Sequence, residues 1–196
     1  MKILIVSDTH SKVKRVSEIY KKLLAKQYPV DIIVHCGDYY ADAMKIHDRL
    51  GVRVLAVRGN CDKCFEEDEY AILETEAGNF FVCHGHMYHV KRNKQSLYYK
   101  ALEMDCVGAI FGHTHRAEKT ELDDFIFINP GSVNKPRDGS GGSFALLTTS
   151  EGHAEAKILR YEDLMASDDS PLIPPKKKSK VTGGFLRRIF NYSDGQ

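Results

Sequence analysis

Short apolar runs rich in β-branched residues alternate with segments of helical periodicity through the first third of the chain, and this alternation restricts the available folds. The apolar runs are Ile3–Val6, Ile32–Val34 and Val52–Val57. Between them, apolar residues recur every three or four positions over 13–24 and 43–50, which is the pattern of amphipathic helices. Strands joined by crossover helices form parallel sheets, so the sequence predicts a βαβαβ unit.

The remainder of the chain predicts a different arrangement. In chain order we expect a hairpin with strands at 70–74 and 79–83, a helix at 93–104 and a strand at 107–111. Four further strand-like runs, which we expect to close the fold as an antiparallel meander, lie at 118–122, 125–129, 143–149 and 155–161. The whole therefore predicts an α/β fold with two mixed sheets.

Polar residues of metal-binding types directly follow five of the predicted strands. In chain order they are Asp8 and His10, Asp38, Asn60, His84, and His113 with His115. Ligands of open α/β sheets bind at the carboxyl ends of the strands, so these side chains are expected to converge. We further expect the Asp-x-His and His-x-His pairs to be extended, with both side chains pointing the same way.

This set of donors predicts a site for two divalent metal ions. Two carboxylates, one amide and four imidazoles are too many for a closed tetrahedral zinc site, but they suit two ions that share a bridging carboxylate. Two divalent cations with two aspartates and one hydroxide leave a positive centre. Such a centre suits an anionic phosphodiester.

At these residues the sequence resembles the calcineurin-like metallophosphoesterase superfamily. The matching motifs are Asp8-Thr9-His10, Gly37-Asp38, Gly59-Asn60-Cys61-Asp62, His84 and Gly112-His113-Thr114-His115. The resemblance covers residues 3 to about 161 and implies a four-layer sandwich, with two mixed β-sheets flanked by α-helices. It also implies two metal sites bridged by Asp38. One would contain Asp8, His10, Asp38 and His115; the other would contain Asp38, Asn60, His84 and His113.

The resemblance also implies a specific enzymatic function, which composition alone does not indicate. We expect a dinuclear phosphodiesterase in which a metal-bridging hydroxide attacks the phosphorus. Mn²⁺ is the first expected metal, with Ni²⁺, Fe²⁺ and Zn²⁺ as alternatives. A phosphomonoesterase or a nuclease of the same fold remains an alternative. So does a non-catalytic protein-binding scaffold, as some eukaryotic relatives of the fold are.

One position departs from the common motif. Much of the superfamily has a histidine after Gly-Asn, where this chain has Cys61. Together with the Asn129-Pro130-Gly131-Ser132 segment, this resembles the small bacterial and archaeal (YfcE-like) phosphodiesterase branch. Cys61 could be a weak donor or a small packing residue, and His86 could supply the missing donor. We therefore count Asp38, Asn60, Cys61 and His86 as catalytic candidates.

Composition bounds the remaining expectations. Lys and Arg number 28 against 27 Asp and Glu, which argues against a stable complex with nucleic acid. No secretory-signal pattern or membrane-length apolar run is present, and the five cysteines form no framework, so we expect a cytoplasmic protein. A metallophosphoesterase domain at 1–164 and a flexible basic tail at 165–196 are expected. The tail is a candidate for contact with a membrane surface or a protein partner, and the sequence does not indicate an oligomeric state.

Overall fold

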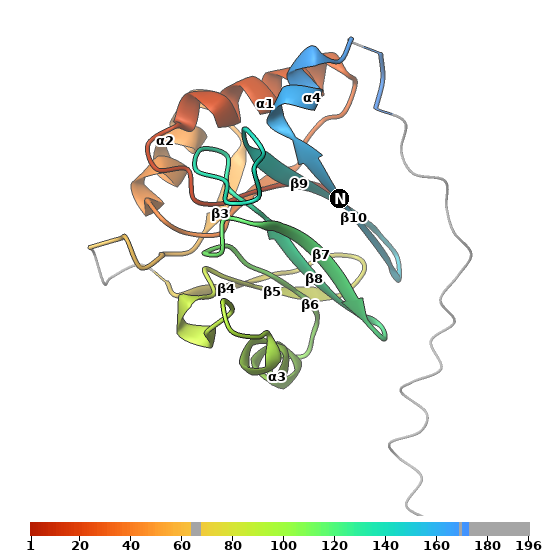
Figure 1. The fold of residues 1–196 in the computed structure, drawn as a ribbon. Coiled ribbons are helices and arrows are strands. Elements are labelled where there is room, and N and C mark those ends of the chain that lie inside the picture. Colours follow the sequence, from red (N-terminus) through yellow and green to blue (C-terminus); the bar gives the residue numbers. More distant parts are fainter. Residues whose placement is uncertain (64–67, 169, 173–196) are drawn as a thin grey trace, which may run out of the picture.

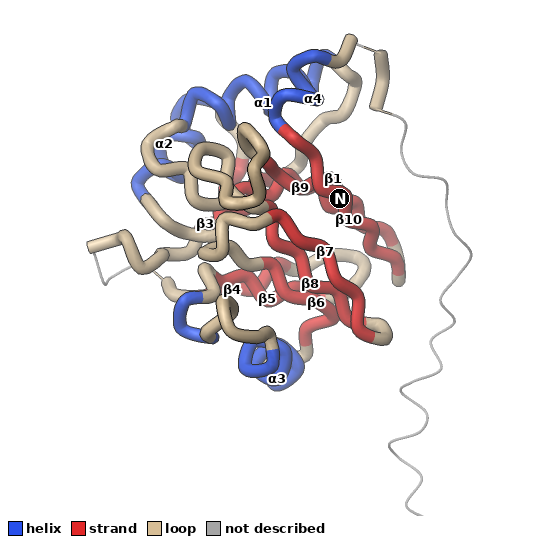
Figure 2. The backbone as a smooth tube through the Cα atoms, in the orientation of Figure 1, coloured by secondary structure: helices blue, strands red, loops and turns tan. Residues whose placement is uncertain are grey.

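Two five-stranded sheets pack face to face and are covered on their outer faces by helices (Figure 1, Figure 2). The computed structural model describes residues 1–63, 68–168 and 170–172. The first sheet contains β10 (His153–Arg160), β9 (Ser143–Ser150), β1 (Lys2–Val6), β2 (Ile32–His35) and β3 (Arg53–Ala56), in this order. The second contains β4 (Tyr70–Leu73), β5 (Asn79–Cys83), β6 (Cys106–Ile110), β8 (Phe125–Pro130) and β7 (Ala117–Leu122).

The helices form the two outer layers. They are α1 (Val13–Ala25), α2 (Tyr40–Leu50), α3 (Gln95–Glu103), α4 (Tyr161–Ala166) and the short 3-10 helix η1 (His86–Tyr88). The first sheet is covered by α1, α2 and α4, and the second by η1 and α3 (Figure 1). The expected four-layer sandwich is confirmed. None of the described helices has the length and apolar character that crossing a bilayer requires.

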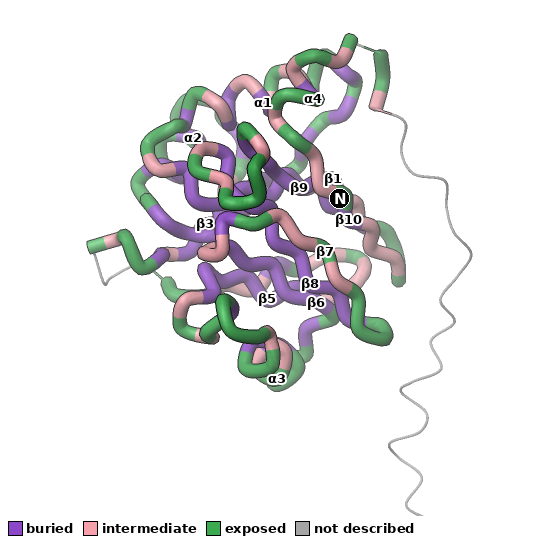
Figure 3. The backbone as a smooth tube through the Cα atoms, viewed as in Figure 1, coloured by how far each residue is buried: buried purple, intermediate pink, exposed green. Residues whose placement is uncertain are grey.

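The predicted βαβαβ unit is the centre of the first sheet, where β1, β2 and β3 are parallel. Side chains of β1 alternate between two cores. Ile3 and Ile5 pack between the sheets, whereas Leu4 and Val6 pack under the helices. Burial on both faces explains why this strand is apolar from Ile3 to Val6. Figure 3 shows the strands of the interior as the buried part of the chain.

The prediction of a closing antiparallel meander was wrong. The four runs form two separate hairpins, β7–β8 in the second sheet and β9–β10 in the first. β8 also pairs in parallel with β6, and β9 pairs antiparallel with β1. Nearly every residue of β8 and β9 is buried, so each needs neighbours on both edges. Each hairpin therefore completes one of the two sheets.

The chain continues to pack beyond residue 164. Helix α4 runs to Ala166, and Lys26 Nζ donates hydrogen bonds to the carbonyl oxygens of Asp168 and Ser170. The Leu172 amide donates to the Lys26 carbonyl at 3.1 Å. Residues 173–196, which hold the basic part of the expected tail, lie outside the described residues, so the division at residue 164 stays a prediction.

Candidate metal centre

Loops from both sheets meet at the carboxyl ends of five strands. Asp8, Asp38 and Asn60 follow β1, β2 and β3 of the first sheet, and His84 and His113 follow β5 and β6 of the second. Backbone hydrogen bonds connect the loops within each sheet: the Asp8 amide donates to the Gly37 carbonyl, and the Gly112 amide to the His84 carbonyl. The His113 amide links the two sheets by donating to Asp8 Oδ2 at 3.2 Å.

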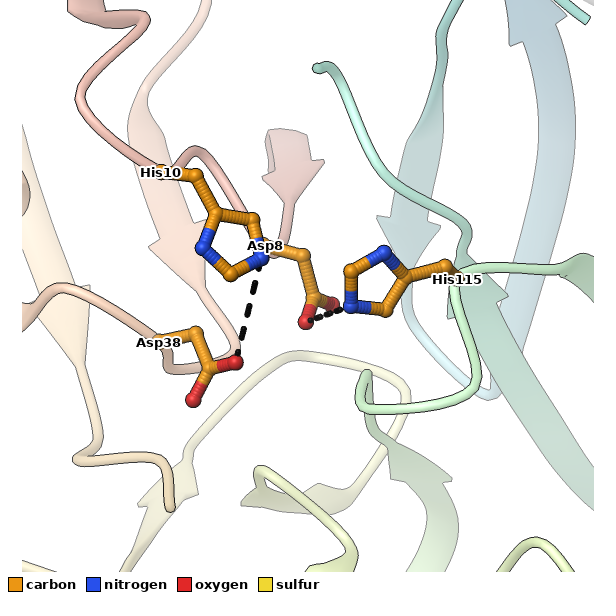
Figure 4. Close-up of side chains that lie close together, drawn as sticks. All are labelled: Asp8, His10, Asp38 and His115. Carbon is orange, nitrogen blue, oxygen red and sulfur yellow. Dashed lines mark ion pairs between the residues drawn. The ribbon is translucent and has the colours of Figure 1, made fainter. Parts of the chain in front are cut away.

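Four of the predicted ligands form a tight cluster, Asp8, His10, Asp38 and His115, whose ligand atoms all lie within 4.8 Å of one another (Figure 4). His115 Nε2 lies 2.9 Å from Asp8 Oδ1, and His10 Nε2 lies 3.9 Å from Asp38 Oδ2. Asp8 Oδ1 and His10 Nε2 are buried without a hydrogen-bond partner among the described residues, and a bound cation would satisfy both.

A second group lies on the other side of Asp38. His84 Nε2 is 3.2 Å from Asp38 Oδ1, and the rings of His84 and His113 are 5.0 Å apart. His86 joins this group, with its ring centroid 5.4 Å from that of His84. His84 Nε2 and His86 Nδ1 are buried without hydrogen bonds in the described part of the chain. Asp38 thus presents one oxygen to each group, as a bridging carboxylate does.

Asn60 lies in the loop after β3, and its side chain contacts Cys61. The residue is exposed, and its amide nitrogen lies 3.6 Å from Cys61 Sγ. The neighbouring Cys61 amide donates to Asp38 Oδ1 at 3.0 Å. Asp62 anchors the same loop by accepting hydrogen bonds from the amides of Gly59 and Tyr40. The acidic residue of the Gly-Asn-Cys-Asp motif therefore shapes the loop, a role that the sequence analysis missed.

Backbone carbonyls fix the orientation of two histidine rings. His84 Nδ1 lies 2.7 Å from the Cys36 carbonyl oxygen, and His115 Nδ1 lies 2.7 Å from that of Lys135. A carbonyl only accepts, so each Nδ1 carries the hydrogen and each Nε2 keeps its lone pair. Metal-ligating histidines are commonly oriented by such contacts. No sequence motif indicates which carbonyl performs this role, and the part played by Lys135 could not be read from spacing.

The loops are not extended, so the expected geometry of the Asp-x-His and His-x-His pairs was wrong. Asp8 and His10 have φ values of 53° and 43°, and His113 and His115 have values of 67° and 58°. Asp38 shares this left-handed conformation, at 58°. Each non-glycine residue there costs about 1–3 kcal/mol, a strain that is typical of functional sites. The turns direct the side chains back toward one point, which extended chain would not do.

Proximity of charges sets the protonation of the cluster. Contact with Asp8 raises the pKa of His115. Burial acts to raise the pKa of Asp8, but His115, His84 and Ser7 together outweigh burial and hold this pKa below its usual value. Burial, with the positive charges of His84 and Lys91, lowers the pKa of His113 to about 4. A neutral imidazole is the form that binds metal.

Cys61 is poorly suited to act as an acid. Its thiol is exposed, and partial burial together with the Asp38 carboxylate raises its pKa to about 11. The thiol is therefore neutral and holds its proton near pH 7. Its backbone amide, which contacts Asp38, is its clearest link to the metal centre.

A buried network that the sequence analysis did not identify supports the loop between Asp8 and Ser11. Thr9 Oγ1 donates to Asp42 Oδ2 at 2.8 Å, and the Ser11 amide donates to the same oxygen at 2.7 Å. His35 Nε2 lies 3.0 Å from Thr9 Oγ1. Because the Thr9 proton goes to Asp42, His35 Nε2 is the donor in that contact. His35, which sequence analysis left without a role, therefore stabilises this loop through its hydrogen bond to Thr9.

We expect His35 to make the fold sensitive to acid. Burial lowers the pKa of His35 to about 4. Between about pH 6.5 and pH 4, the His35 imidazole is therefore protonated in the unfolded chain but neutral in the folded chain. Stability is therefore complete above pH 6.5 and falls as the pH drops, by about 3 kcal/mol from this residue. His35→Gln should flatten this part of the slope in urea unfolding between pH 4.5 and 8. An unchanged slope would contradict this account of His35.

The comparison with known proteins decides the family. The family model described as "Calcineurin-like phosphoesterase superfamily domain" matches residues 1–152. The chain belongs to this superfamily. Among curated proteins of the superfamily, "Probable metallophosphoesterase YsnB" of Bacillus subtilis is 32% identical over 163 residues, which are 83% of this chain and 91% of the relative.

Solved structures of calcineurin-like phosphoesterases share the fold. A predicted phosphoesterase from Streptococcus pneumoniae superposes with a TM-score of 0.67 at 23% identity, covering 82% of this chain and 90% of that one. YfcE, a phosphoesterase from Escherichia coli, superposes with a TM-score of 0.55 at 25% identity, covering 76% and 88%. The same E. coli protein carries the curated name "Phosphodiesterase YfcE". The chain is thus an enzyme of the phosphoesterase class, and the proposed ligands lie at its strand ends.

Proposed function

We propose that the chain is a phosphodiesterase that depends on two divalent metal ions. The observation that supports this most is the position of Asp38. Its two oxygens face His10 on one side and His84 on the other, at 3.9 and 3.2 Å from the Nε2 atoms. Unpartnered buried donors in both groups are the chemistry that a pair of cations requires.

The proposed ligand sets follow the two groups. Asp8, His10, Asp38 and His115 would hold one metal, and Asp38, Asn60, His84 and His113 would hold the other. When bound, two such ions polarise the phosphoryl oxygens and lower the pKa of a water molecule. The oxygen and nitrogen donors suit Mn²⁺ first, with Ni²⁺, Fe²⁺ and Zn²⁺ as alternatives. Asn60 would join after a change of side-chain rotamer.

The protein's own groups would bind and orient the ester. In the hydrolysis, water oxygen bonds to phosphorus, one ester P–O bond breaks and the leaving oxygen gains a proton. His86 is the proposed donor of a hydrogen bond to the phosphate, because its Nδ1 has no hydrogen-bond partner among the described residues and its ring lies beside those of His84 and His113. The neutral Cys61 thiol is a weaker candidate for the same task.

Two supporting observations concern substrate and compartment. The name of YfcE specifies a phosphodiesterase, which favours a diester over a monoester for this chain too. Four cysteines are free in the described residues, Cys36, Cys61, Cys83 and Cys106. Free thiols are typical of a reducing compartment, so we propose a cytoplasmic location.

Metal dependence tests the proposal directly. Purified protein should contain divalent metal by elemental analysis and should hydrolyse bis(p-nitrophenyl) phosphate with Mn²⁺. EDTA should reduce the rate at least a hundredfold, and Mn²⁺ should restore it. A higher kcat/KM for p-nitrophenyl phosphate would instead favour a phosphomonoesterase. Protein without metal or hydrolysis of either ester, after Mn²⁺ is added, would contradict the proposal.

A further inference from the structure

A cavity of about 300 Å³ opens beside the proposed second metal site. Its lining consists of His86, His89, Lys91, Arg92 and His113. Two of these, His86 and His113, also belong to the group around His84. The other three lie in the loop that leaves η1 toward α3. The cavity therefore extends outward from the place where the phosphate of a substrate would bind.

The charge of this cavity is uncompensated. Among the described residues, every one that lines the cavity is a histidine, lysine or arginine, and none is a carboxylate. Lys91 and Arg92 are exposed, and within the described residues neither forms an ion pair. Lys94, three residues beyond Lys91, instead pairs with Glu118. The whole chain has a net charge of only +1. The two adjacent unpaired cations therefore concentrate positive charge at this cavity, on a protein that is otherwise nearly neutral.

The backbone of the loop that carries the two cations is anchored. Val90 precedes them, is buried and packs in the core under α3. The amides of Tyr88 and Val90 donate to the Gly85 carbonyl, and the Arg92 amide donates to that of His89. A Cβ at Gly85 would lie 2.8 Å from Val90 Cγ2, so the turn closes tightly on the valine. A site that is ordered before binding loses less entropy when a ligand binds.

The positive charge also reaches the metal centre. Lys91 lines the same cavity as His113, which is a proposed ligand of the second metal. A small ligand could therefore contact the metals and the two cations at once. The cavity volume lies at the lower end of about 300–1,000 Å³ found for small-molecule sites.

We propose that this cavity is a subsite for a second anionic group on the substrate, a phosphomonoester carried by one arm of the phosphodiester. The inference rests on the proposed function, because the scissile phosphate is taken to lie on the metals. A phosphomonoester has a charge of about −1.5 to −2 at pH 7. Arginine binds such a group through two parallel hydrogen bonds and lysine through its point charge. The substrate class would thus be phosphorylated diesters of nucleotide size.

Two matched chromogenic esters test this subsite. One is thymidine 5′-(p-nitrophenyl phosphate), and the other is the same ester with an additional 3′-phosphate. With Mn²⁺ present, we expect the wild type to hydrolyse the 3′-phosphorylated ester with a kcat/KM at least tenfold higher, mainly through a lower KM. The double variant Lys91→Gln, Arg92→Gln should reduce this preference to about one.

Two further double variants show whether a lost preference comes from binding at the cavity or from a change in overall charge or folding. Lys21→Gln with Lys157→Gln removes the same charge from exposed positions on α1 and β10 and should keep the preference. Lys91→Arg with Arg92→Lys retains both charges and should also keep most of it. The subsite alone would be overturned if the wild type hydrolysed bis(p-nitrophenyl) phosphate but showed no preference for the 3′-phosphorylated ester. It would also be overturned if the preference survived in the variant Lys91→Gln, Arg92→Gln. No hydrolysis of any diester would overturn the proposed function and the subsite with it.

Discussion

Replacing Asp38 with asparagine is expected to abolish diester hydrolysis and to leave the protein folded. The carboxylate faces both histidine clusters, so the amide would lose the bridging charge between two cations. Metal ions contribute several kcal/mol to stabilising the transition state, and each 1.36 kcal/mol is tenfold in rate. We therefore expect kcat to fall at least about a thousandfold, with less metal bound at a given concentration.

The fold should tolerate this change because asparagine has the same shape as aspartate. Its Oδ1 can still accept the hydrogen bond from the Cys61 amide, which holds the β3 loop at 3.0 Å. Elemental analysis, the rate with bis(p-nitrophenyl) phosphate and urea unfolding would each be measured. Asp48→Asn, an exposed position on α2, is the charge-matched control and should behave as wild type. Asp38→Asn protein that keeps more than a tenth of the wild-type rate would contradict the assignment.

The parallel part of the fold could be predicted because burial leaves a local pattern. Strand β1 is buried on both faces from Ile3 to Val6, so this run is apolar without interruption, and apolar residues in the adjoining helix recur at helical spacing. The placement of β8 and β9 could not be predicted in the same way. Both have an apolar segment and are buried along most of their length, and this pattern indicates an interior strand without saying in which sheet. The partner is settled by packing between residues more than a hundred positions apart, as in the pairing of Ile3 with Leu147.

The candidate site could also be predicted only in part. The types of residue after each strand pointed to the cluster of Asp8, His10, Asp38 and His115, because ligand chemistry is a property of the side chain. Their geometry was not accessible, since the left-handed turns are stabilised by tertiary contacts. One such contact is the hydrogen bond from Ser132 Oγ to the Asp8 carbonyl. Asp42 was missed for the same reason, because a buried acid on a helix has no distinguishing motif.

Gly59 is where a single methyl group should damage both stability and activity. A Cβ at this position would lie 2.2 Å from Asp38 Oδ1 and 2.4 Å from the Asp38 backbone nitrogen. Side-chain rotation cannot relieve a clash with backbone, so the loops after β2 and β3 must separate. We expect Gly59→Ala to cost about 3 kcal/mol of stability, at the upper end for overpacking. A displacement of about 1 Å at Asp38 should also lower kcat about a hundredfold.

A second glycine separates this steric effect from general sensitivity to alanine. Gly51 ends α2 with φ of 65°, and a Cβ there would meet nothing within 4 Å. Gly51→Ala should therefore cost only about 1–2 kcal/mol, from the left-handed backbone, and keep the wild-type kcat. Urea unfolding and the rate per mole of folded protein would be compared for the two variants. If Gly59→Ala matched Gly51→Ala in both, Asp38 would not be packed against the β3 loop. If only stability fell, hydrolysis would not depend on the exact position of Asp38, and the bridging assignment would fail even with the fold intact.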